Sequence, residues 1–190
     1  GEGHTPLPWD EVFERGVRAH LVTWRQLLTM GEGRIGWKMG YMDSALRARL
    51  GLPHPLVGFL TTGRRIPDGG VLHCAPETRL LAESEVALRL GRDLAPGCTP
   101  GEAADAIDAL APAMEIVDVT RPLEDMALIL AGNLFHAAVV LGPPLTRRKH
   151  EPLPDVTGGL WVNAIQQGTV DPASLLQNPG ALLAQVAGLL

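Results

Sequence analysis

The chain has 190 residues, of which 46% are hydrophobic and 19% are charged, and its formal net charge is −5. At this length one hydrophobic core can bury most of the apolar surface, and the composition is too apolar for intrinsic disorder. The acidic balance argues against nucleic-acid binding, and the apolar runs are too short to cross a membrane, so we expect neither kind of partner.

The two cysteines, Cys74 and Cys98, have neither a zinc-binding spacing nor the density of a disulfide scaffold. No signal peptide opens the sequence, so we expect a cytoplasmic protein. We also expect residues 1–190 to form a single domain, because no linker or repeat divides the sequence.

The first half of the chain begins with a helical pattern. Apolar residues recur at helical spacing over residues 9–30, which predicts an amphipathic helix. Arg34–Gly40 is typical of a short strand, and Asp43–Leu50 of a short helix that ends before a glycine and a proline. From Val57 to Cys74, β-forming residues alternate with turn residues, which predicts hairpins.

The second half begins with the clearest strand, Arg79–Leu90, whose side chains alternate between two faces. Thr99 and Glu102 form a capping-box pattern that predicts a helix to about Leu110. Further elements are predicted in this order: a strand over Pro112–Val119, a helix over Leu123–Leu130, a strand over His136–Leu141, a strand over Gly159–Ala164, and a helix from about Ala173 to Leu190. The class is therefore α+β with a β-rich core.

Three glutamates stand out within these strands. Glu83 and Glu85 lie two residues apart and share one face of their strand, where like charges repel one another unless a cation lies between them. Glu115 is a third carboxylate, inside an apolar strand. Three carboxylates without cysteine or histidine ligands suit a hard cation such as Mg²⁺ or Mn²⁺.

A plainer explanation exists for the same glutamates. A Glu-x-Glu pattern is common on the exposed face of a sheet, and nearby arginines, namely Arg79, Arg89 and Arg121, could supply salt bridges. The spacing of the carboxylates leaves both interpretations open.

Several short motifs follow one another in a fixed order. Gly36–Gly40 reads G-x-K-x-G, residues 55–60 read PLVGFL, residues 82–94 read AESEVALRLGRDL, and residues 112–118 read PAMEIVD, before Gly132 and Asn133. In this order they resemble the motifs of the fumarylacetoacetate hydrolase superfamily, in its 2-oxopent-4-enoate hydratase and 4-oxalocrotonate decarboxylase branch. The resemblance extends from about Gly31 to Gly142 and continues more weakly to Leu190.

The resemblance implies a β-rich fold with short flanking helices and assembly into a homo-oligomer. It also implies that Glu83, Glu85 and Glu115 hold Mg²⁺ or Mn²⁺, and that a small 2-oxo acid binds the ion through its carboxylate and 2-oxo oxygen. The ion would act as a Lewis acid that stabilises negative charge on that oxygen.

Four further residues receive roles from the resemblance. Lys38 would lie beside the developing negative charge, and His136 would replace a missing proton carrier. Asn133 and Thr62 would contact the substrate. A surface position for Lys38 and a core position for His136 are the alternatives, whereas His20 is interpreted as a core residue of the first helix.

The chain departs from the family pattern at three places. Thr61 and Thr62 stand where the family carries an acidic residue for proton transfer, and Gly132 stands where it carries an aspartate. The family continues with further strands beyond the position of Leu190, so the resemblance implies either a shortened core or closing strands outside this sequence.

Together these features predict a lyase of the hydratase or decarboxylase type. Decarboxylation or tautomerisation needs less proton-transfer machinery than addition of water, so the missing acids favour it. A C–C hydrolase of the acylpyruvate type is an alternative that uses the same carboxylates. A catalytically inactive relative, which only binds ligand or metal, is a third.

Overall fold

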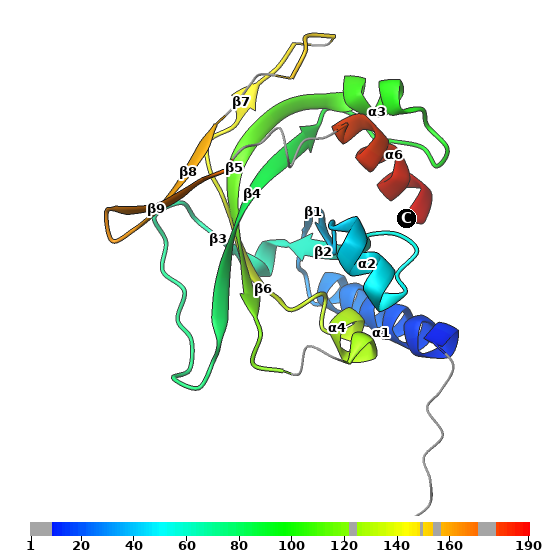
Figure 1. Ribbon diagram of the computed structural model, residues 1–190, viewed down its shortest axis with the longest axis vertical. Helices are drawn as coiled ribbons and strands as arrows, with labels where there is room; N and C mark the ends of the chain where they lie inside the picture. The colour runs from blue at the N-terminus through cyan, green and yellow to red at the C-terminus, as the bar shows by residue number, and fades with distance from the viewer. Residues whose placement is uncertain (1–8, 122–124, 149, 154–156, 171–177) are drawn as a thin grey trace, which may run out of the picture. The chain divides into compact units, whose positions relative to one another are not determined.

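The computed structural model describes residues 9–121, 125–148, 150–153, 157–170 and 178–190 (Figure 1). The chain forms two compact units: residues 1–83 with 115–139, and residues 84–114 with 140–190. Three strands run from one unit into the other. That residues 1–190 form one domain therefore stays a prediction.

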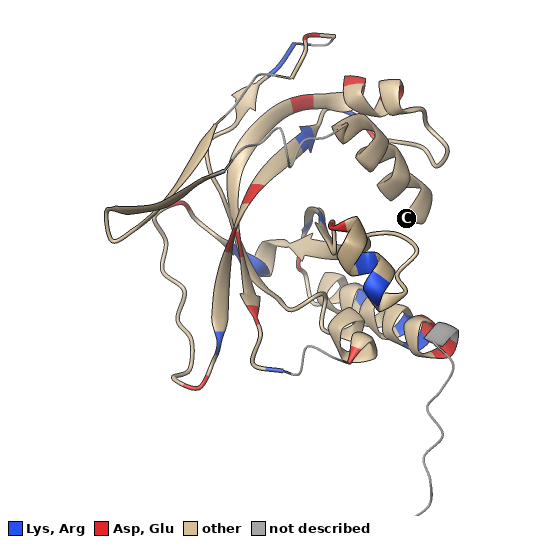
Figure 2. Cartoon of the chain, in the orientation of Figure 1, with Lys and Arg blue, Asp and Glu red and all other residues tan. Residues whose placement is uncertain are grey.

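Short helices and strands make up the first part of the chain, in this order: α1 (Trp9–Thr29), β1 (Arg34–Gly40), α2 (Ser44–Leu50), β2 (Leu56–Thr61), a 3₁₀ turn (Thr62–Arg64) and β3 (Arg65–Ile66). In helix α1 the acidic residues lie in the first turns and the basic residues Arg15, Arg18 and Arg25 follow them (Figure 2). None of the helices in the described part of the chain is both long and apolar enough to span a membrane.

Long strands dominate the remainder, which contains β4 (Leu80–Leu90), α3 (Pro100–Ala106), β5 (Ile107–Asp118), α4 (Met126–Ala131), β6 (His136–Leu141), β7 (Leu145–Thr146), β8 (Gly158–Val162), β9 (Ile165–Val170) and α6 (Pro179–Leu189). The main sheet has the order β3-β6-β5-β4, and β7 pairs with β5. Strands β1 and β2 form a separate antiparallel pair, as do β8 and β9. This mixture confirms the predicted α+β class.

The core of the first unit lies under α1 and α4. Its buried residues are Leu52, Leu56, Met126, Ile129, Leu130 and Leu134. Helix α1 approaches α4 closely at Gly16, where an added Cβ would lie 2.8 Å from the Cβ of Leu130. Burying a leucine contributes about 1.5–3 kcal/mol, so these residues supply much of the stability that holds β2 and α4 in place.

Local capping signals set the helix boundaries. Asp43 caps α2 by accepting a hydrogen bond from the Leu46 N–H, and Gly51 ends the helix in the left-handed conformation, with φ of 69°. Thr99 and Glu102 form the predicted capping box of α3. Each such cap typically contributes about 1 kcal/mol.

Three local predictions were wrong. Residues 107–110, predicted as the end of a helix, begin β5, because their apolar run extends the strand instead. The hairpins predicted between 57 and 74 do not form, since β2 pairs with β1 and β3 pairs with β6. Strand β9 was not predicted. The predicted start of the fourth helix at Leu123 and of the last helix at Ala173 lie outside the described residues.

Candidate active site

A cluster of polar side chains in the first unit lies against strands β1 and β2. Their antiparallel register places Lys38 directly opposite Gly58. A Cβ at position 58 would lie 2.8 Å from the Lys38 Cγ and 2.8 Å from the Asn133 Oδ1. Glycine is therefore required at this position, because both side chains pass over the backbone of β2.

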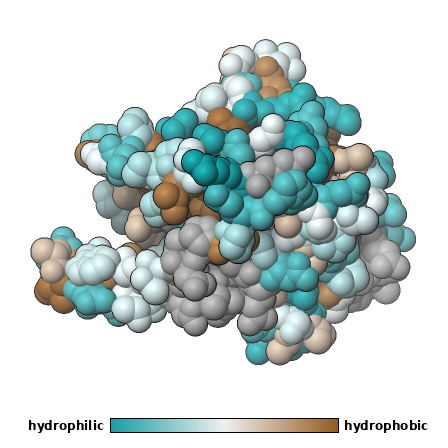
Figure 3. All heavy atoms as spheres, turned by 90° about the horizontal axis from the view of Figure 1, so that it is seen from above, coloured by the Kyte–Doolittle hydropathy of each residue, from teal (hydrophilic) through white to brown (hydrophobic). Residues whose placement is uncertain are grey.

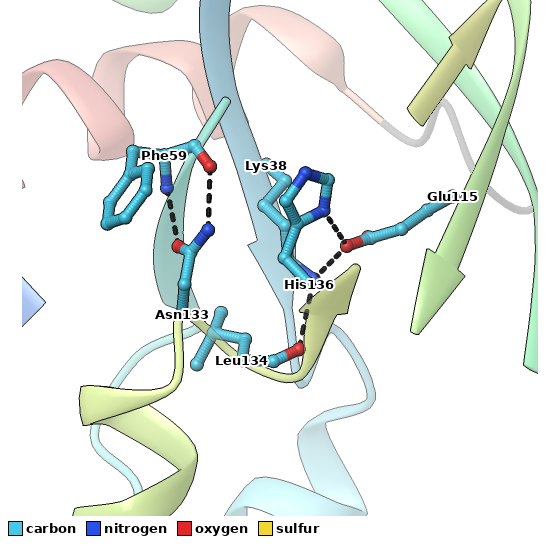
Figure 4. A network of polar contacts seen from close by, with 6 residues as sticks. All are labelled: Lys38, Phe59, Glu115, Asn133, Leu134 and His136. Carbon is cyan, nitrogen blue, oxygen red and sulfur yellow. Dashed lines mark hydrogen bonds and ion pairs between the residues drawn. The ribbon is translucent and has the colours of Figure 1, made fainter. Parts of the chain in front are cut away.

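Asn133 is held by the backbone of Phe59 at both ends of its amide. Its Oδ1 accepts a hydrogen bond from the Phe59 N–H at 2.8 Å, and its Nδ2 donates one to the Phe59 carbonyl at 2.8 Å (Figure 4). The residue is buried. Phe59 lies opposite Trp37 in the β1–β2 pair, and these two bonds to its backbone fix the turn that follows α4 against β2.

That turn has an unusual backbone conformation. Asn133, Leu134 and Phe135 have φ values of 56°, 54° and 63°, in the left-handed region that non-glycine residues rarely adopt. The conformation lets the Leu134 carbonyl accept a hydrogen bond from Lys38 Nζ at 3.2 Å. The turn therefore determines where the lysine ammonium lies.

One carboxylate oxygen joins the cluster together. Glu115 Oε1 accepts a hydrogen bond from Lys38 Nζ (Figure 4). The same oxygen lies 2.8 Å from His136 Nδ1. The side chains of Lys38, Glu115 and His136 are only 9%, 8% and 1% exposed. A carboxylate and an ammonium are thus paired out of contact with bulk water, where each needs the other.

The protonation of Glu115 follows from these neighbours. Burial acts to raise the pKa of its carboxyl, but the hydrogen bond from His136 and the positive charge of Lys38 oppose it and lower the pKa below its ordinary value. Glu115 is therefore a carboxylate at neutral pH and can act as an anionic ligand.

The second ring nitrogen of His136 is buried and has no hydrogen-bond partner among the described residues. Buried polar atoms are nearly always satisfied by protein, water or ligand, so this nitrogen is an exception. The imidazole thus contacts Glu115 through Nδ1, and its Nε2 has no partner among the described residues.

The other predicted site residues are Glu83, Glu85 and Thr62. Glu83 and Glu85 are exposed on β4, where their separation by two residues puts them on one face. Thr62 is exposed, and its Oγ1 accepts a hydrogen bond from the Gly33 N–H at 2.8 Å, whereas neighbouring Thr61 is buried. The structure thus brings together Lys38, Glu115, Asn133 and His136.

The fit of a divalent cation can be judged from these donors. Carboxylates suit Mg²⁺ and Mn²⁺ in kind and in charge. No three histidine, cysteine, aspartate or glutamate side chains in the described ranges are grouped closely enough to hold a metal ion, and Glu115 Oε1 already serves Lys38 and His136. The donor chemistry therefore fits, and a cation at Glu115 would share this carboxylate with Lys38 and His136.

Sequence reasoning identified most of the polar side chains but missed their supports. Gly58, Phe59 and Leu134 act through backbone groups or through the lack of a side chain, and no motif signals such roles. The interpretation of His20 as a core residue is confirmed, since it is buried and its Nδ1 lies 3.2 Å from the Leu130 carbonyl.

Comparison with known proteins identifies sequence relatives. No family model matches the chain. A 4-oxalocrotonate decarboxylase from Pseudomonas sp. is 31% identical over 166 residues, which cover 84% of this chain and 62% of the relative. The 2-keto-4-pentenoate hydratase 1 of Dechloromonas aromatica is 34% identical over 95 residues, which cover 50% of this chain and 36% of the relative. The chain thus spans less than two thirds of these curated relatives.

Solved structures show the same fold. The 4-oxalocrotonate decarboxylase of Pseudomonas putida G7 in complex with calcium and acetate has a TM-score of 0.74 at 23% identity, over 98% of this chain and 82% of that chain. The same enzyme in complex with magnesium and adipate has a TM-score of 0.71 at 19% identity, over 98% of this chain and 83% of that chain. At these identities, the similarity establishes the fold.

Proposed function

We propose that this chain, which is similar in sequence to 4-oxalocrotonate decarboxylases and 2-keto-4-pentenoate hydratases, belongs to the fumarylacetoacetate hydrolase superfamily and is a divalent-metal-dependent lyase. Its substrate is a small 2-oxo acid or the enol of one. The observation that carries the proposal is the buried cluster of Lys38, Glu115 and His136, because such a costly arrangement of charges needs a functional reason.

We assign the cation, Mg²⁺ or Mn²⁺, to Glu83, Glu85 and Glu115. When bound, such an ion supplies Lewis-acid stabilisation of negative charge on the 2-oxo oxygen of the substrate. The assignment is supported by the order of sequence motifs and by the anionic state of Glu115. A related enzyme of the same fold binds magnesium and a dicarboxylic acid, adipate.

The chain's own residues then divide the remaining work. The Lys38 ammonium stabilises the anionic oxygen that develops on the substrate, since it is largely desolvated and has a third N–H bond besides those to Glu115 and Leu134. His136 transfers a proton through its second ring nitrogen, because Glu115 contacts the first. Glu115 keeps the ring oriented.

The contacts of Asn133 and Thr62 indicate that these side chains hold backbone segments in place. Both ends of the Asn133 amide bond to Phe59, and the Thr62 hydroxyl bonds to the Gly33 N–H, so their hydrogen bonds position backbone segments. Direct contact of either side chain with substrate stays a prediction from the sequence.

Decarboxylation or enol–keto exchange is favoured over addition of water. Thr61 and Thr62 occupy the place of an acidic group, and a threonine hydroxyl is not a general base at neutral pH. His136 is the residue of the cluster to which we assign proton transfer. A single proton transfer to carbon suffices for decarboxylation, whereas hydration needs a second group to activate water.

A catalytically inactive relative is a second candidate, supported by the absence of a three-carboxylate group in the part of the chain that the structure describes. The C–C hydrolase alternative gains no support from His20, because this residue is buried and its Nδ1 lies close to the Leu130 carbonyl.

Assembly and location complete the proposal. We place the protein in the cytoplasm as a homo-oligomer. Exposed apolar side chains support association: Trp161, Val162 and Ile165 on the β8–β9 pair are each at least half exposed. Hydrophobic patches on one surface of the molecule are visible among hydrophilic ones in Figure 3.

The test uses Mn²⁺-loaded protein with a panel of small 2-oxo acids, and product analysis separates decarboxylation, hydration, cleavage and enol–keto exchange. Glu115→Gln is expected to abolish turnover, whereas Arg89→Met, which removes an exposed charge, is expected to retain it. Absence of turnover on every substrate, together with saturable Mn²⁺ binding, would favour the inactive relative.

A further inference from the structure

Lys38 donates a hydrogen bond to Oε1 of Glu115, one of the carboxylates to which we assign the metal ion. We propose that the Lys38 ammonium and the divalent cation compete for Glu115, so that binding of the cation releases Lys38 toward the substrate. The lysine is thus an internal cation that balances Glu115 in the metal-free protein. The inference rests on the proposed metal site and describes its regulation.

The contacts of Glu115 support competition. Lys38 and His136 both contact Oε1, and the side chain of Glu115 is only 8% exposed. A buried carboxylate without a partner is strongly destabilising, so the metal-free chain needs a cation at this oxygen. Lys38, on strand β1, is this cation.

Simultaneous occupancy is unfavourable on electrostatic grounds. An ammonium and a divalent ion bound to one carboxylate in a poorly hydrated site repel one another strongly, because the interaction grows as the effective dielectric constant falls. An imidazole, unlike an ammonium, can donate a hydrogen bond in its uncharged form, so His136 can stay at Glu115 when the cation binds. The ligand exchange therefore involves Lys38.

The structure also provides a place for the released lysine. Nζ donates a second hydrogen bond to the Leu134 carbonyl, which the left-handed turn holds in position. The lysine stem lies over Gly58, where no side chain blocks it. Lys38 can thus leave Glu115 and keep Leu134 as its partner, which frees N–H bonds for an anionic substrate oxygen.

The experiment titrates chelator-treated protein with Mn²⁺ and follows free ion by electron paramagnetic resonance. We expect Lys38→Met to bind Mn²⁺ about tenfold more tightly than the wild type, opposite in sign to the tenfold to hundredfold loss that follows when a residue supporting a metal ligand is removed. Lys38→Arg keeps the positive charge and should bind as weakly as the wild type. Arg89→Met is the matched control, because it removes one positive charge from an exposed pair with Asp108.

The possible outcomes distinguish failure of the Lys38 competition from failure of the proposed metal site. Unchanged or weaker Mn²⁺ binding by Lys38→Met would overturn competition while leaving the metal site intact, as would equally tight binding by Lys38→Arg. No saturable binding by any variant would overturn the proposed metal site itself. If only Lys38→Met bound Mn²⁺ saturably, Lys38 would exclude the cation from Glu115 in the wild type, which would support competition.

Thermal unfolding without turnover gives an independent measure. Metal-free Lys38→Met should melt at a lower temperature than the wild type, because Glu115 loses its buried cation. Saturating Mn²⁺ should raise the melting temperature of Lys38→Met more than that of the wild type. An equal increase in both proteins would contradict the exchange of one cation for another.

Discussion

Strand β5 carries two carboxylates that each pair with a cation, in very different surroundings. Near its end, Glu115 contacts Lys38 with side chains 8% and 9% exposed. Near its start, Asp108 accepts a hydrogen bond from Arg89 at 2.6 Å, with side chains 40% and 54% exposed. Solvent screens the second pair, so it contributes little. Burial, and not the presence of a contact, therefore decides which ion pair matters to this protein.

The largest expected effect comes from breaking the buried pair. Glu115→Ala leaves the Lys38 ammonium buried without its carboxylate, which should lower the free energy of unfolding by about 3–5 kcal/mol. Urea denaturation followed by circular dichroism measures the change. A loss below about 1 kcal/mol would mean that the Lys38–Glu115 pair is as well hydrated as an exposed one.

The next largest loss of stability is expected at Asn133, whose hydrogen bonds to Phe59 hold the turn that contacts Lys38. Asn133→Ala removes two hydrogen bonds and leaves the Phe59 N–H and carbonyl buried without partners, at a cost of about 2–4 kcal/mol. Asn133→Asp keeps the acceptor for the Phe59 N–H but places a buried carboxylate oxygen against the Phe59 carbonyl, so it should cost at least as much in the unfolding experiment. A much smaller loss for Asn133→Asp would show that the bond to the Phe59 carbonyl contributes little.

Histidine 20 gives a pH-dependent effect that is independent of the site carboxylates. Burial lowers the pKa of His20 below 6.5, against the raising influence of its hydrogen bond to Leu130. The unfolded chain therefore binds a proton more readily, so the stability due to neutral His20 is complete above pH 6.5 and is lost as the pH falls below it.

Melting temperatures between pH 7.5 and pH 5 measure this effect, with His20→Gln as the control variant. Glutamine can still donate to the Leu130 carbonyl but does not titrate, so its curve should fall less over this range. Identical pH dependence of the two proteins would assign the change to other groups.

The smallest effect is expected at the exposed pair. Asp108→Asn should leave the urea midpoint nearly unchanged, because water replaces the lost contact with Arg89. A shift as large as that of Glu115→Ala would remove the contrast between the two ends of β5. The same measurement on Arg89→Met tests the other partner.

Local chemistry made much of the fold predictable from sequence. The helix caps at Asp43 and Thr99 act within a few residues, and the alternation of Leu80–Leu90 fixes a strand without reference to the remainder of the chain. Residues 107–110 failed because an apolar run suits a buried strand as well as a helix, and pairing of β5 in the sheet decides between them.

The site was predictable in its side chains and not in its arrangement. Lys38, Glu115 and His136 were identified from motif order, but 77 residues separate the lysine from its carboxylate, and spacing alone does not predict their pairing. The left-handed turn at Asn133–Phe135 has no glycine to signal it. It depends on Phe59, which only the tertiary structure brings near.

That turn has a consequence for the order in which the protein folds. Three non-glycine residues in the left-handed region cost about 1–2 kcal/mol each, and the bonds from Asn133 to Phe59 that offset this cost span 74 residues. The turn is therefore unfavourable until β2 and α4 have already come together. We expect the lysine, glutamate and histidine to meet only late in folding, after the hydrophobic core of the first unit has formed.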